Sequence, residues 1–301
     1  MEDLTGKVAV VTGGASGIGL ALAERFGREG CNIVLADIEE ASLSEAVAHM
    51  RRSGIEARGQ VTDVADYASV QRLKDYVDTI FGGTDLLFNN AGVSITGPTW
   101  LMSPDDWRWV WDVNVWGVVN GIRAFVPSML ERGEPGHIIN TGSLASFNGN
   151  GDHAPYCSSK AAVLGLSQAL YSEMTAMMTG IGVSIICPGM VATRIHQSWR
   201  NRPGRDRPWS DREFADADFV DGSEAFQGRG ISPQNIASAT LEAVRDGRFY
   251  VFAGDTWPRF LEETVGRAIR AENPLVLTWG EDRRPSEQRA PAPWHSAAAE
   301  L

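Results

Sequence analysis

A glycine-rich turn between a short apolar run and a helical pattern is the feature that most restricts the fold of this 301-residue chain. Residues 7–12 form a nearly continuous apolar run, which is typical of a buried strand in a parallel sheet. Residues 13–19 then hold four glycines in the spacing G-x-x-x-G-x-G, and residues 20–28 have a helical pattern. Such a turn lets the backbone approach phosphate oxygens, and the helix N-terminus adds partial positive charge. The turn therefore predicts a dinucleotide site, because a simple tight turn with positive φ needs only one glycine.

An acidic residue at the end of the second predicted strand indicates which dinucleotide is bound. Residues 32–36 read as that strand, and Asp37 follows the turn by about 20 residues, where a carboxylate can bond the adenosine ribose hydroxyls. A carboxylate there repels a 2′-phosphate, and no Lys or Arg occurs inside the turn or right after Asp37. We therefore expect NAD rather than NADP. The alternative is that Asp37 caps the next helix, which starts near Glu40.

Tyr156, Lys160 and Ser143 are the candidate catalytic residues. Tyr156 and Lys160 are four residues apart, which on a helix places both side chains on one face, about 5–6 Å apart at Cβ. A neighbouring cation favours the phenolate and moves the pKa of a tyrosine toward working pH, where a proton donor or acceptor is most effective. Ser143 follows an apolar run that reads as a strand end, and its hydroxyl could hold the reacting oxygen. By itself, a Tyr-x-x-x-Lys pair also arises by chance on solvated helices.

Strand and helix patterns alternate along the chain, which predicts an α/β fold with a parallel sheet and helices on both faces. We expect a Rossmann-type, doubly wound single domain over residues 1–280. The expected later strands are residues 86–89, 137–141, 183–187 and 249–253. The expected later helices are residues 42–52, 65–81, 105–130, 156–178, 233–246 and 259–271.

Taken together, these motifs resemble the short-chain dehydrogenase/reductase family over roughly residues 5 to 254. The matching segments are the glycine turn after Thr12, the pair after the third strand, the Asn-Asn-Ala-Gly run after the fourth, and the loop from Pro188 to Thr193. The resemblance implies four catalytic residues, namely Asn114, Ser143, Tyr156 and Lys160. It implies a cofactor site made of Gly13, Ser16, Gly17, Ile18, Gly19, Asp37, Asp63, Val64, Asn90, Ala91, Gly92, Tyr156, Lys160, Pro188, Gly189, Val191 and Thr193.

The resemblance also implies an activity, namely hydride transfer between NAD and a secondary alcohol or its ketone. Tyr156 would exchange the proton, Ser143 would hold the same oxygen, and Lys160 would lower the pKa of Tyr156 and hold the nicotinamide ribose. Asn114 would support a water that links Lys160 to solvent. A non-catalytic dinucleotide-binding regulator on the same fold is the alternative, because fold does not fix function.

Charge and composition limit which kinds of partner and which cellular compartment we expect. The 27 Lys and Arg residues against 38 Asp and Glu residues give a net charge of −11, which argues against a nucleic acid or an anionic membrane as partner. No apolar stretch reaches spanning length, and a strand begins too early to leave room for a signal peptide. Three scattered cysteines suit a reducing cytosol, so we expect a cytoplasmic protein. The five histidines have no metal-ligand spacing, so we expect no metal site.

The helix at residues 105–130 has two opposite apolar stripes, one with Trp107, Trp111 and Asn114, the other with Trp109, Val113 and Trp116. One stripe should face the sheet. The other would contact a partner subunit in a homodimer or homotetramer, or else the neighbouring helix.

Residues 194–230 are too long for a simple connection. Their five aromatic residues (Trp199, Trp209, Phe214, Phe219 and Phe226) suggest a lid over a bulky, apolar alcohol or ketone, and a surface helix pair docked on the core is the equal alternative. We expect pocket specificity to come also from Ala145, Phe147, Asn148 and Asn150. The tail over residues 281–301 is expected to be flexible.

Overall fold

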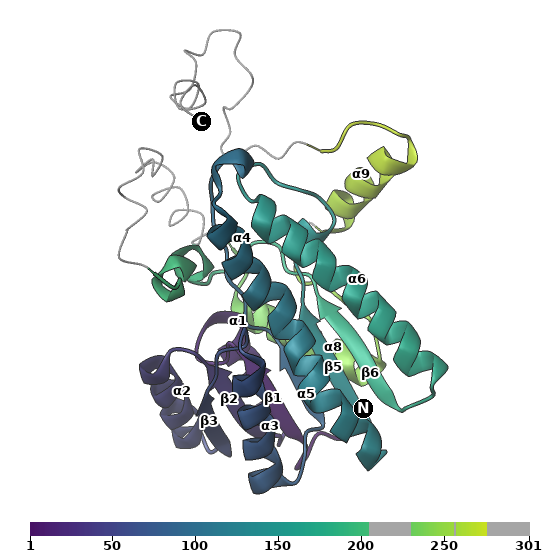
Figure 1. Ribbon diagram of the computed structural model, residues 1–301. Helices are drawn as coiled ribbons and strands as arrows, with labels where there is room; N and C mark the ends of the chain where they lie inside the picture. Colours follow the sequence, from purple (N-terminus) through teal and green to yellow (C-terminus); the bar gives the residue numbers. More distant parts are fainter. Residues whose placement is uncertain (205–229, 256, 276–301) are drawn as a thin grey trace.

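A parallel sheet forms the centre of the protein in the computed structural model, which describes residues 1–204, 230–255 and 257–275 (Figure 1). The described part contains a seven-stranded sheet in the order β3-β2-β1-β4-β5-β6-β7, and every neighbouring pair is parallel. The strands are β1 (Val8–Thr12), β2 (Asn32–Asp37), β3 (Ala57–Val61), β4 (Leu86–Asn89), β5 (Gly136–Thr141), β6 (Ile181–Ile186) and β7 (Tyr250–Val251).

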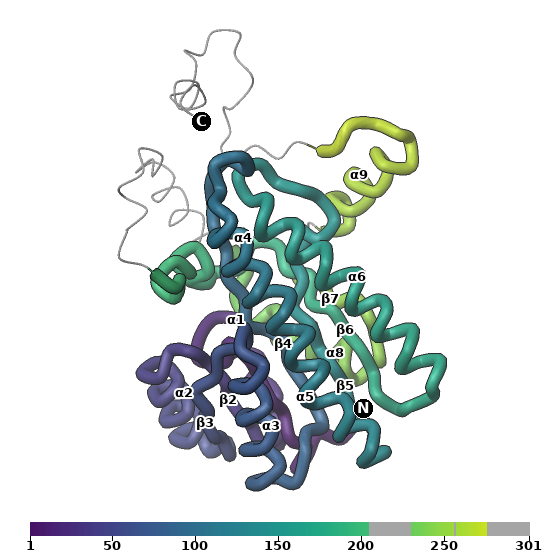
Figure 2. Tube along the Cα trace, in the orientation of Figure 1, coloured from purple at the N-terminus to yellow at the C-terminus, as the bar shows by residue number. Residues whose placement is uncertain are grey.

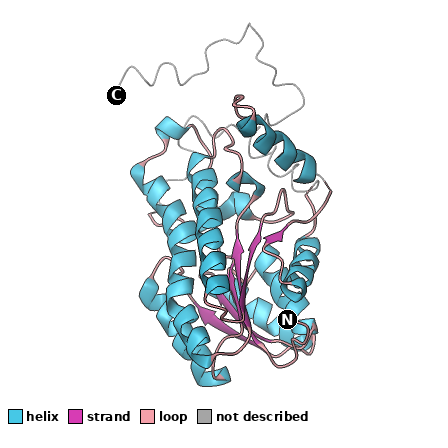
Figure 3. Ribbon diagram, turned by 90° about the vertical axis from the view of Figure 1, so that its right-hand side faces the viewer, coloured by secondary structure: helices cyan, strands magenta, loops and turns pink. Residues whose placement is uncertain are grey.

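Helices cover both faces of this sheet (Figure 3). One face packs against α1 (Gly17–Arg28), α2 (Glu40–Arg52) and α8 (Pro233–Asp246), and the other packs against α3 (Tyr67–Phe81), α5 (Gly117–Arg132) and α6 (Ala154–Ala176). Ala9 and Val11 of β1 enter the first core, whereas Val8 and Val10 enter the second, because strand side chains alternate in direction. The predicted doubly wound α/β fold is therefore confirmed.

The strand order reverses beside β1. The chain runs outward from β1 through β2 to β3, then crosses back to β4 and continues to β7 on the other side. The connections that leave the carboxyl ends of β1 and β4 therefore diverge and open a crevice, which is where parallel α/β sheets bind ligands.

The expected continuous helix over residues 105–130 is wrong in one respect. The chain forms α4 (Pro104–Trp111), then a π-helical turn, η2 (Asp112–Trp116), and then α5. A π turn inserts one extra residue into the helical repeat, so the two predicted stripes do not run straight through it. Ser103 and Asp106 form a capping box that starts α4.

The tryptophans of this region make contacts within the chain. Trp109 is buried, and Trp107 packs against the same small cluster. Trp111 donates a hydrogen bond from Nε1 to Ser158 Oγ of α6 at 3.4 Å, so a contact with a neighbouring helix is found. Trp116 is 51% exposed, so a subunit contact at this residue stays a prediction.

The remaining elements surround the carboxyl end of the sheet. They are the short helices η1 (Thr99–Leu101), η3 (Leu144–Ser146) and η4 (Ile195–Asn201), and α9 (Trp257–Ile269), which lies at the same end of the molecule as α4 (Figure 2). β7 is shorter than the strand expected at residues 249–253. Within the described residues, none of the helices combines the length and apolarity required to cross a bilayer.

Candidate active site

A cavity of about 2030 Å³ opens at the carboxyl end of the sheet. All the predicted site residues line it except Gly19 and Asn114, which lie directly behind its wall. The lining members of that set are Gly13, Ser16, Gly17, Ile18, Asp37, Asp63, Val64, Asn90, Ala91, Gly92, Ser143, Tyr156, Lys160, Pro188, Gly189, Val191 and Thr193. One cavity therefore contains residues that are up to 180 positions apart in the chain.

The glycine turn is shaped by close backbone contacts. Gly13 and Gly17 have φ values of 62° and 54°, in the region that glycine tolerates best. A Cβ atom on Gly19 would lie 2.1 Å from the Gly13 carbonyl oxygen, and one on Gly13 would lie 2.8 Å from Ala91 Cα. The first turn of α1 contains no acidic residue. Its free N–H groups and helix dipole therefore suit a phosphate group, and the turn has the shape of a pyrophosphate cradle.

Asp37 links the glycine turn to the start of α2. Its Oδ2 atom accepts a hydrogen bond from Ala15 N at 3.0 Å, and its Oδ1 atom accepts one from Glu39 N at 3.1 Å. Burial raises the pKa of the Asp37 carboxyl, and the N–H groups of Glu39 and Ala15 act against that rise. The N-cap of α2 is Glu39, so Asp37 is not the cap that the alternative interpretation required.

The segment after β4 is fixed above the turn by Thr12. The Oγ1 atom of Thr12 accepts hydrogen bonds from Asn90 N at 2.9 Å and Ala91 N at 3.1 Å, and it donates to Phe88 O. The Asn90 side chain donates in return to Thr12 O at 3.0 Å. These contacts hold β1 and β4 together at the strand-order reversal, on one side of the cavity.

The three candidate catalytic residues come from two elements. Ser143 follows β5 and accepts a hydrogen bond from Ala145 N at 3.0 Å, while Tyr156 and Lys160 lie one turn apart on α6. Lys160 Nζ donates to Thr141 O at 2.7 Å and lies 5.8 Å from the centre of the Tyr156 ring. The spacing expected from the sequence therefore brings these groups to one wall of the cavity.

The pKa values of the ligand-free protein differ from the sequence-based expectation. Burial raises the pKa of Tyr156, and a hydrogen bond with Ser143 acts against this rise. Burial also lowers the pKa of Lys160 to about 8. The expected fall in the pKa of Tyr156 is therefore absent here, because desolvation of the phenolate outweighs the opposing effect of Ser143.

Asn114 lies on the π turn and is fully buried. Its Oδ1 atom accepts from Val93 N at 2.8 Å, and its Nδ2 atom donates to Val93 O at 3.0 Å and to Ser159 Oγ at 2.9 Å. Ser159 in turn donates to Tyr156 O at 2.7 Å. The Asn114 side chain thus joins the segment after β4 to the helix that carries Tyr156.

The substrate half of the cavity matches the sequence only in part. Ala145 and Asn150 line it as expected. Phe147 instead packs toward Tyr250 and Phe252, and Asn148 donates to Leu275 O at 3.2 Å. Of the five predicted lid aromatics, Trp199 is half exposed, and the other four lie outside the described residues, as does the 281–301 tail.

Several lining residues carried no sequence signal. Trp109 and Val113 face the cavity, although their stripe was expected to meet the sheet or another surface. Glu39, Arg200 and Asn201 also line it, and Arg200 bonds Glu39 across 161 positions of sequence. Local patterns contain no information on such a pairing. Among the described residues, no group of three His, Cys, Asp or Glu side chains could hold a metal ion.

A parallel doubly wound sheet with a glycine cradle at its reversal point and a Tyr-Lys-Ser group beside it defines a nucleotide-binding oxidoreductase site. The family model for short chain dehydrogenases matches residues 7–204, and the chain belongs to that family.

Relatives extend this similarity over nearly the whole chain. A C alpha-dehydrogenase of Sphingobium sp. is 32% identical over 94% of this chain and 96% of its own. A 1-deoxy-11-beta-hydroxypentalenate dehydrogenase of Streptomyces exfoliatus is 35% identical over 82% of each chain. A short chain dehydrogenase/reductase from Burkholderia phymatum, solved in complex with NAD, is 36% identical, with a TM-score of 0.87 over 92% of this chain and 99% of its own.

Proposed function

We propose that this chain is an NAD-dependent dehydrogenase that transfers a hydride between the nicotinamide and a secondary alcohol or its ketone. The observation that carries the proposal is the shared cavity: the glycine cradle and the Tyr156, Lys160 and Ser143 side chains line one space. A bound dinucleotide supplies the hydride chemistry, and the protein orients the reactants and handles the proton.

Tyr156 is the proton-transferring residue in this proposal. In the oxidative direction the Tyr156 phenolate takes the proton of the substrate alcohol and becomes a phenol, and in the reductive direction the phenol returns that proton. Ser143 donates a hydrogen bond to the same substrate oxygen and stabilises the charge that develops there. The position of both side chains on the lining of one cavity supports this division of roles.

Lys160 and Asn114 are assigned supporting roles. Lys160 is a buried cation one helical turn from Tyr156, and it would also bond the nicotinamide ribose. Asn114 fixes Val93 and, through Ser159, the turn that carries Tyr156. It would thereby support the water that links Lys160 to solvent.

NAD rather than NADP is proposed as the cofactor. Two carboxylates, Asp37 and Glu39, line the end of the cavity where a 2′-phosphate would lie. Arg194 and Arg200 also line the cavity, but Arg200 forms an ion pair with Glu39. The relative from Burkholderia phymatum was solved with NAD, which supports the same choice.

A bulky substrate with a large apolar part is proposed from the size and lining of the cavity. Single-ligand pockets are commonly about 300–1,000 Å³, so a cavity of about 2030 Å³ leaves room for a large substrate beside a dinucleotide. Apolar side chains contribute to its substrate half, among them Val93, Trp109, Leu144, Met190 and Phe260. We also propose a homo-oligomer, supported by the exposure of Trp100 and Trp116; a monomeric sedimentation profile at micromolar concentration would refute it.

The test is a spectrophotometric screen for NADH formation over steroid, terpenoid, aromatic and aliphatic secondary alcohols, followed by Tyr156→Phe. Removing the phenol oxygen should lower turnover by at least about 10²–10⁴-fold while NADH binding stays nearly unchanged. Tyr171→Phe is the matched control, because Tyr171 lies on the same helix, is 41% exposed and packs against Phe249.

Two outcomes would contradict the proposal. If Tyr156→Phe keeps its activity within tenfold of the wild type, Tyr156 is not the acid/base. If the wild type binds NADH but turns over no alcohol or ketone in the panel, the non-catalytic regulator becomes the better interpretation.

A further inference from the structure

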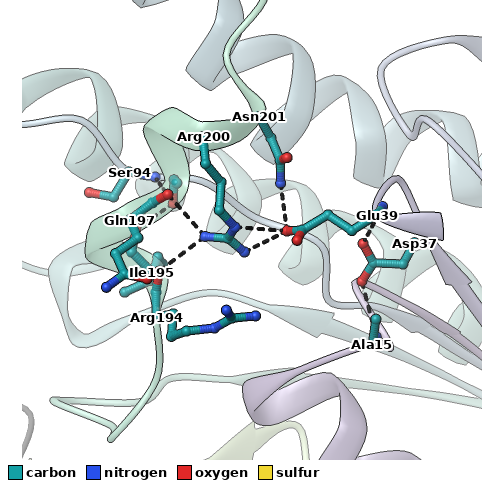
Figure 4. A network of polar contacts seen from close by, with 10 residues as sticks. Ala15, Asp37, Glu39, Ser94, Arg194, Ile195, Gln197, Arg200 and Asn201 are labelled. Atoms are coloured by element: carbon teal, nitrogen blue, oxygen red, sulfur yellow. Dashed lines mark hydrogen bonds and ion pairs between the residues drawn. The ribbon is translucent and has the colours of Figure 1, made fainter. Parts of the chain in front are cut away.

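A three-donor contact joins the segment after Thr193 to the start of α2. Arg200 donates to Glu39 Oε1 from Nε at 2.9 Å and from Nη2 at 2.6 Å, and Asn201 Nδ2 donates to the same oxygen at 2.8 Å (Figure 4). We call residues 194–202 the strap. The contact brings together residues 161 and 162 positions apart in sequence.

This contact is more buried and contains more hydrogen bonds than an ordinary surface ion pair. The two side chains are only 27% and 24% exposed, and Arg200 Nη1 also donates to Gln197 O at 2.9 Å, which fixes the guanidinium within its own turn. Burial alone would raise the pKa of Glu39, but the Arg200 and Asn201 hydrogen bonds hold it below its usual value. Exposed ion pairs contribute little to stability, whereas hydrogen bonds to charged groups in partly buried positions contribute more than neutral ones.

The strap is held at the substrate end as well. Ser94 N donates to Ser198 Oγ at 3.2 Å, and Arg202 forms an ion pair with the fully buried Asp106 of α4. Ser94 follows the β4 segment beside Asn114, and Asp106 lies in the first turn of the helix that leads to the π turn. The strap is thus anchored at both ends of the same cavity.

The position of Glu39 places this contact beside the proposed cofactor site. Glu39 is two residues from Asp37, and its own N–H bonds the Asp37 carboxylate. The strap lines the cavity through Arg194, Ile195, His196, Ser198, Arg200, Asn201 and Arg202. A dinucleotide whose ribose reaches Asp37 would therefore lie between the glycine turn and the strap.

We propose that Glu39 is a positioning residue that fastens the strap over the bound dinucleotide and so completes the wall of the substrate half. This inference rests on the proposed function. When the contact between Glu39 and Arg200 opens, the dinucleotide can leave; when it closes, the dinucleotide is retained and Ile195, His196 and Ser198 take their places near the substrate. Cofactor retention and substrate binding are therefore coupled through one carboxylate, since both depend on the same segment.

The experiment compares NADH dissociation by stopped-flow fluorescence in the wild type, Glu39→Gln, Arg200→Gln and the double variant. Each single variant should release NADH about tenfold faster, as expected for the loss of one charge-assisted contact, and should raise KM for both cofactor and substrate. NADH should dissociate from the double variant no faster than from the faster single variant, because both substitutions remove the same contact between residues 39 and 200.

Glu29→Gln is the matched control. Glu29 is also a glutamate that pairs with an arginine of a distant element, Arg245, but it does not line the cavity. Its NADH dissociation rate should stay within twofold of the wild type. Dissociation rates within twofold of the wild type in Glu39→Gln and Arg200→Gln would overturn the proposal.

Hydrogen exchange of the cofactor-free protein separates this proposal from the proposed function. Amides of residues 195–201 should exchange faster in Glu39→Gln than in the wild type, because the strap opens more often. If the wild type binds no dinucleotide, the proposed function fails, and the exchange result still shows whether Glu39 fastens the strap. Unchanged exchange in this segment would show that Glu39 does not fasten the strap.

Discussion

Lys160 Nζ donates a hydrogen bond to the Thr141 carbonyl oxygen at 2.7 Å, which ties α6 to the carboxyl end of β5. Both residues are buried, and burial lowers the pKa of Lys160 to about 8 from its ordinary 10.5. The folded protein therefore holds an ammonium group in surroundings that disfavour its charge. This makes Lys160 a destabilising residue for the fold, retained where the proposed chemistry needs a cation.

Lys160→Met should stabilise the cofactor-free protein near neutral pH. The unfolded chain keeps this proton up to about pH 10.5 and the folded chain only up to about pH 8, so the penalty is complete below pH 8 and disappears as pH rises toward 10.5. We expect a gain of about 1–3 kcal/mol in the free energy of unfolding at pH 7, reduced by the lost hydrogen bond to Thr141. Urea unfolding at pH 7 and pH 9.5 measures it, and the gain should shrink at the higher pH.

Lys74→Met is the control for this prediction. The hydrogen bond that Lys74 donates to the Asp78 carboxylate raises the pKa of Lys74, so the charge of Lys74 stabilises the folded state at pH 7. The control should leave stability unchanged or lower it. Lys160→Met could instead be less stable than the wild type at pH 7, by the amount that one lost hydrogen bond accounts for. That result would show that burial of the Lys160 charge does not destabilise the folded protein.

Gly19→Ala should damage the glycine cradle. The new methyl group would lie 2.1 Å from the Gly13 carbonyl oxygen, which is backbone and cannot move aside cheaply. We expect a loss of about 1–3 kcal/mol in the free energy of unfolding, together with a loss of NADH affinity. Gly165→Ala in α6 is the control: a Cβ there meets nothing within 4 Å, so stability should rise by about 0.5–1 kcal/mol. Equal changes in the free energy of unfolding and in NADH affinity in the two variants would contradict the close backbone contacts of the cradle.

The parts of the fold that local patterns determine were predictable from the sequence. The run before Gly13 and the four glycines after it define β1, the turn and α1, and α8 has the predicted bounds of residues 233–246. The position of Asp37 in the cavity lining was predictable, because one helix and one strand set its distance from the glycine turn. The parallel sheet followed from the alternation of these elements.

Other features depend on contacts that no local pattern records. The π turn at Asn114 adds one residue to a repeat whose apolar positions continue on both sides of it. The contact between Glu39 and Arg200 joins positions that only the folded chain brings together. The pKa direction of Tyr156 depends on burial, which the spacing of Tyr156 and Lys160 does not reveal.

Asp37→Ser should weaken the preference for NAD over NADP. Removing the carboxylate removes the repulsion of a 2′-phosphate, so the ratio of kcat/KM for the two cofactors should fall by at least about tenfold. Steady-state kinetics with NAD and NADP measure this ratio. Asp66→Ser is the control, because Asp66 caps α3, does not itself line the cavity, and serine can cap a helix equally well. An unchanged ratio in Asp37→Ser would refute the assigned role.

Asn114→Asp tests whether the π turn positions the catalytic helix. A carboxylate of the same shape can still accept from Val93 N, but it cannot donate to Val93 O or to Ser159 Oγ. We expect a loss of about 2–3 kcal/mol in the free energy of unfolding, because buried acceptors lose their donor and a charge is buried. With saturating cofactor and well below the melting temperature, kcat should fall at least about 100-fold, because Tyr156 loses its indirect support.

Asn120→Asp separates that loss of activity from a loss of stability. Asn120 is buried on α5, and its Nδ2 atom donates to Val64 O at 2.9 Å, so the same substitution removes a comparable hydrogen bond. Its stability should fall by a similar amount, while its kcat with saturating cofactor stays within about threefold of the wild type, since its side chain donates to Val64 O and Ala65 O and not to the helix that carries Tyr156. If both variants lose activity in proportion to stability, Asn114 acts only through the fold. A selective loss in Asn114→Asp would instead trace the activity to the link through Ser159 to Tyr156.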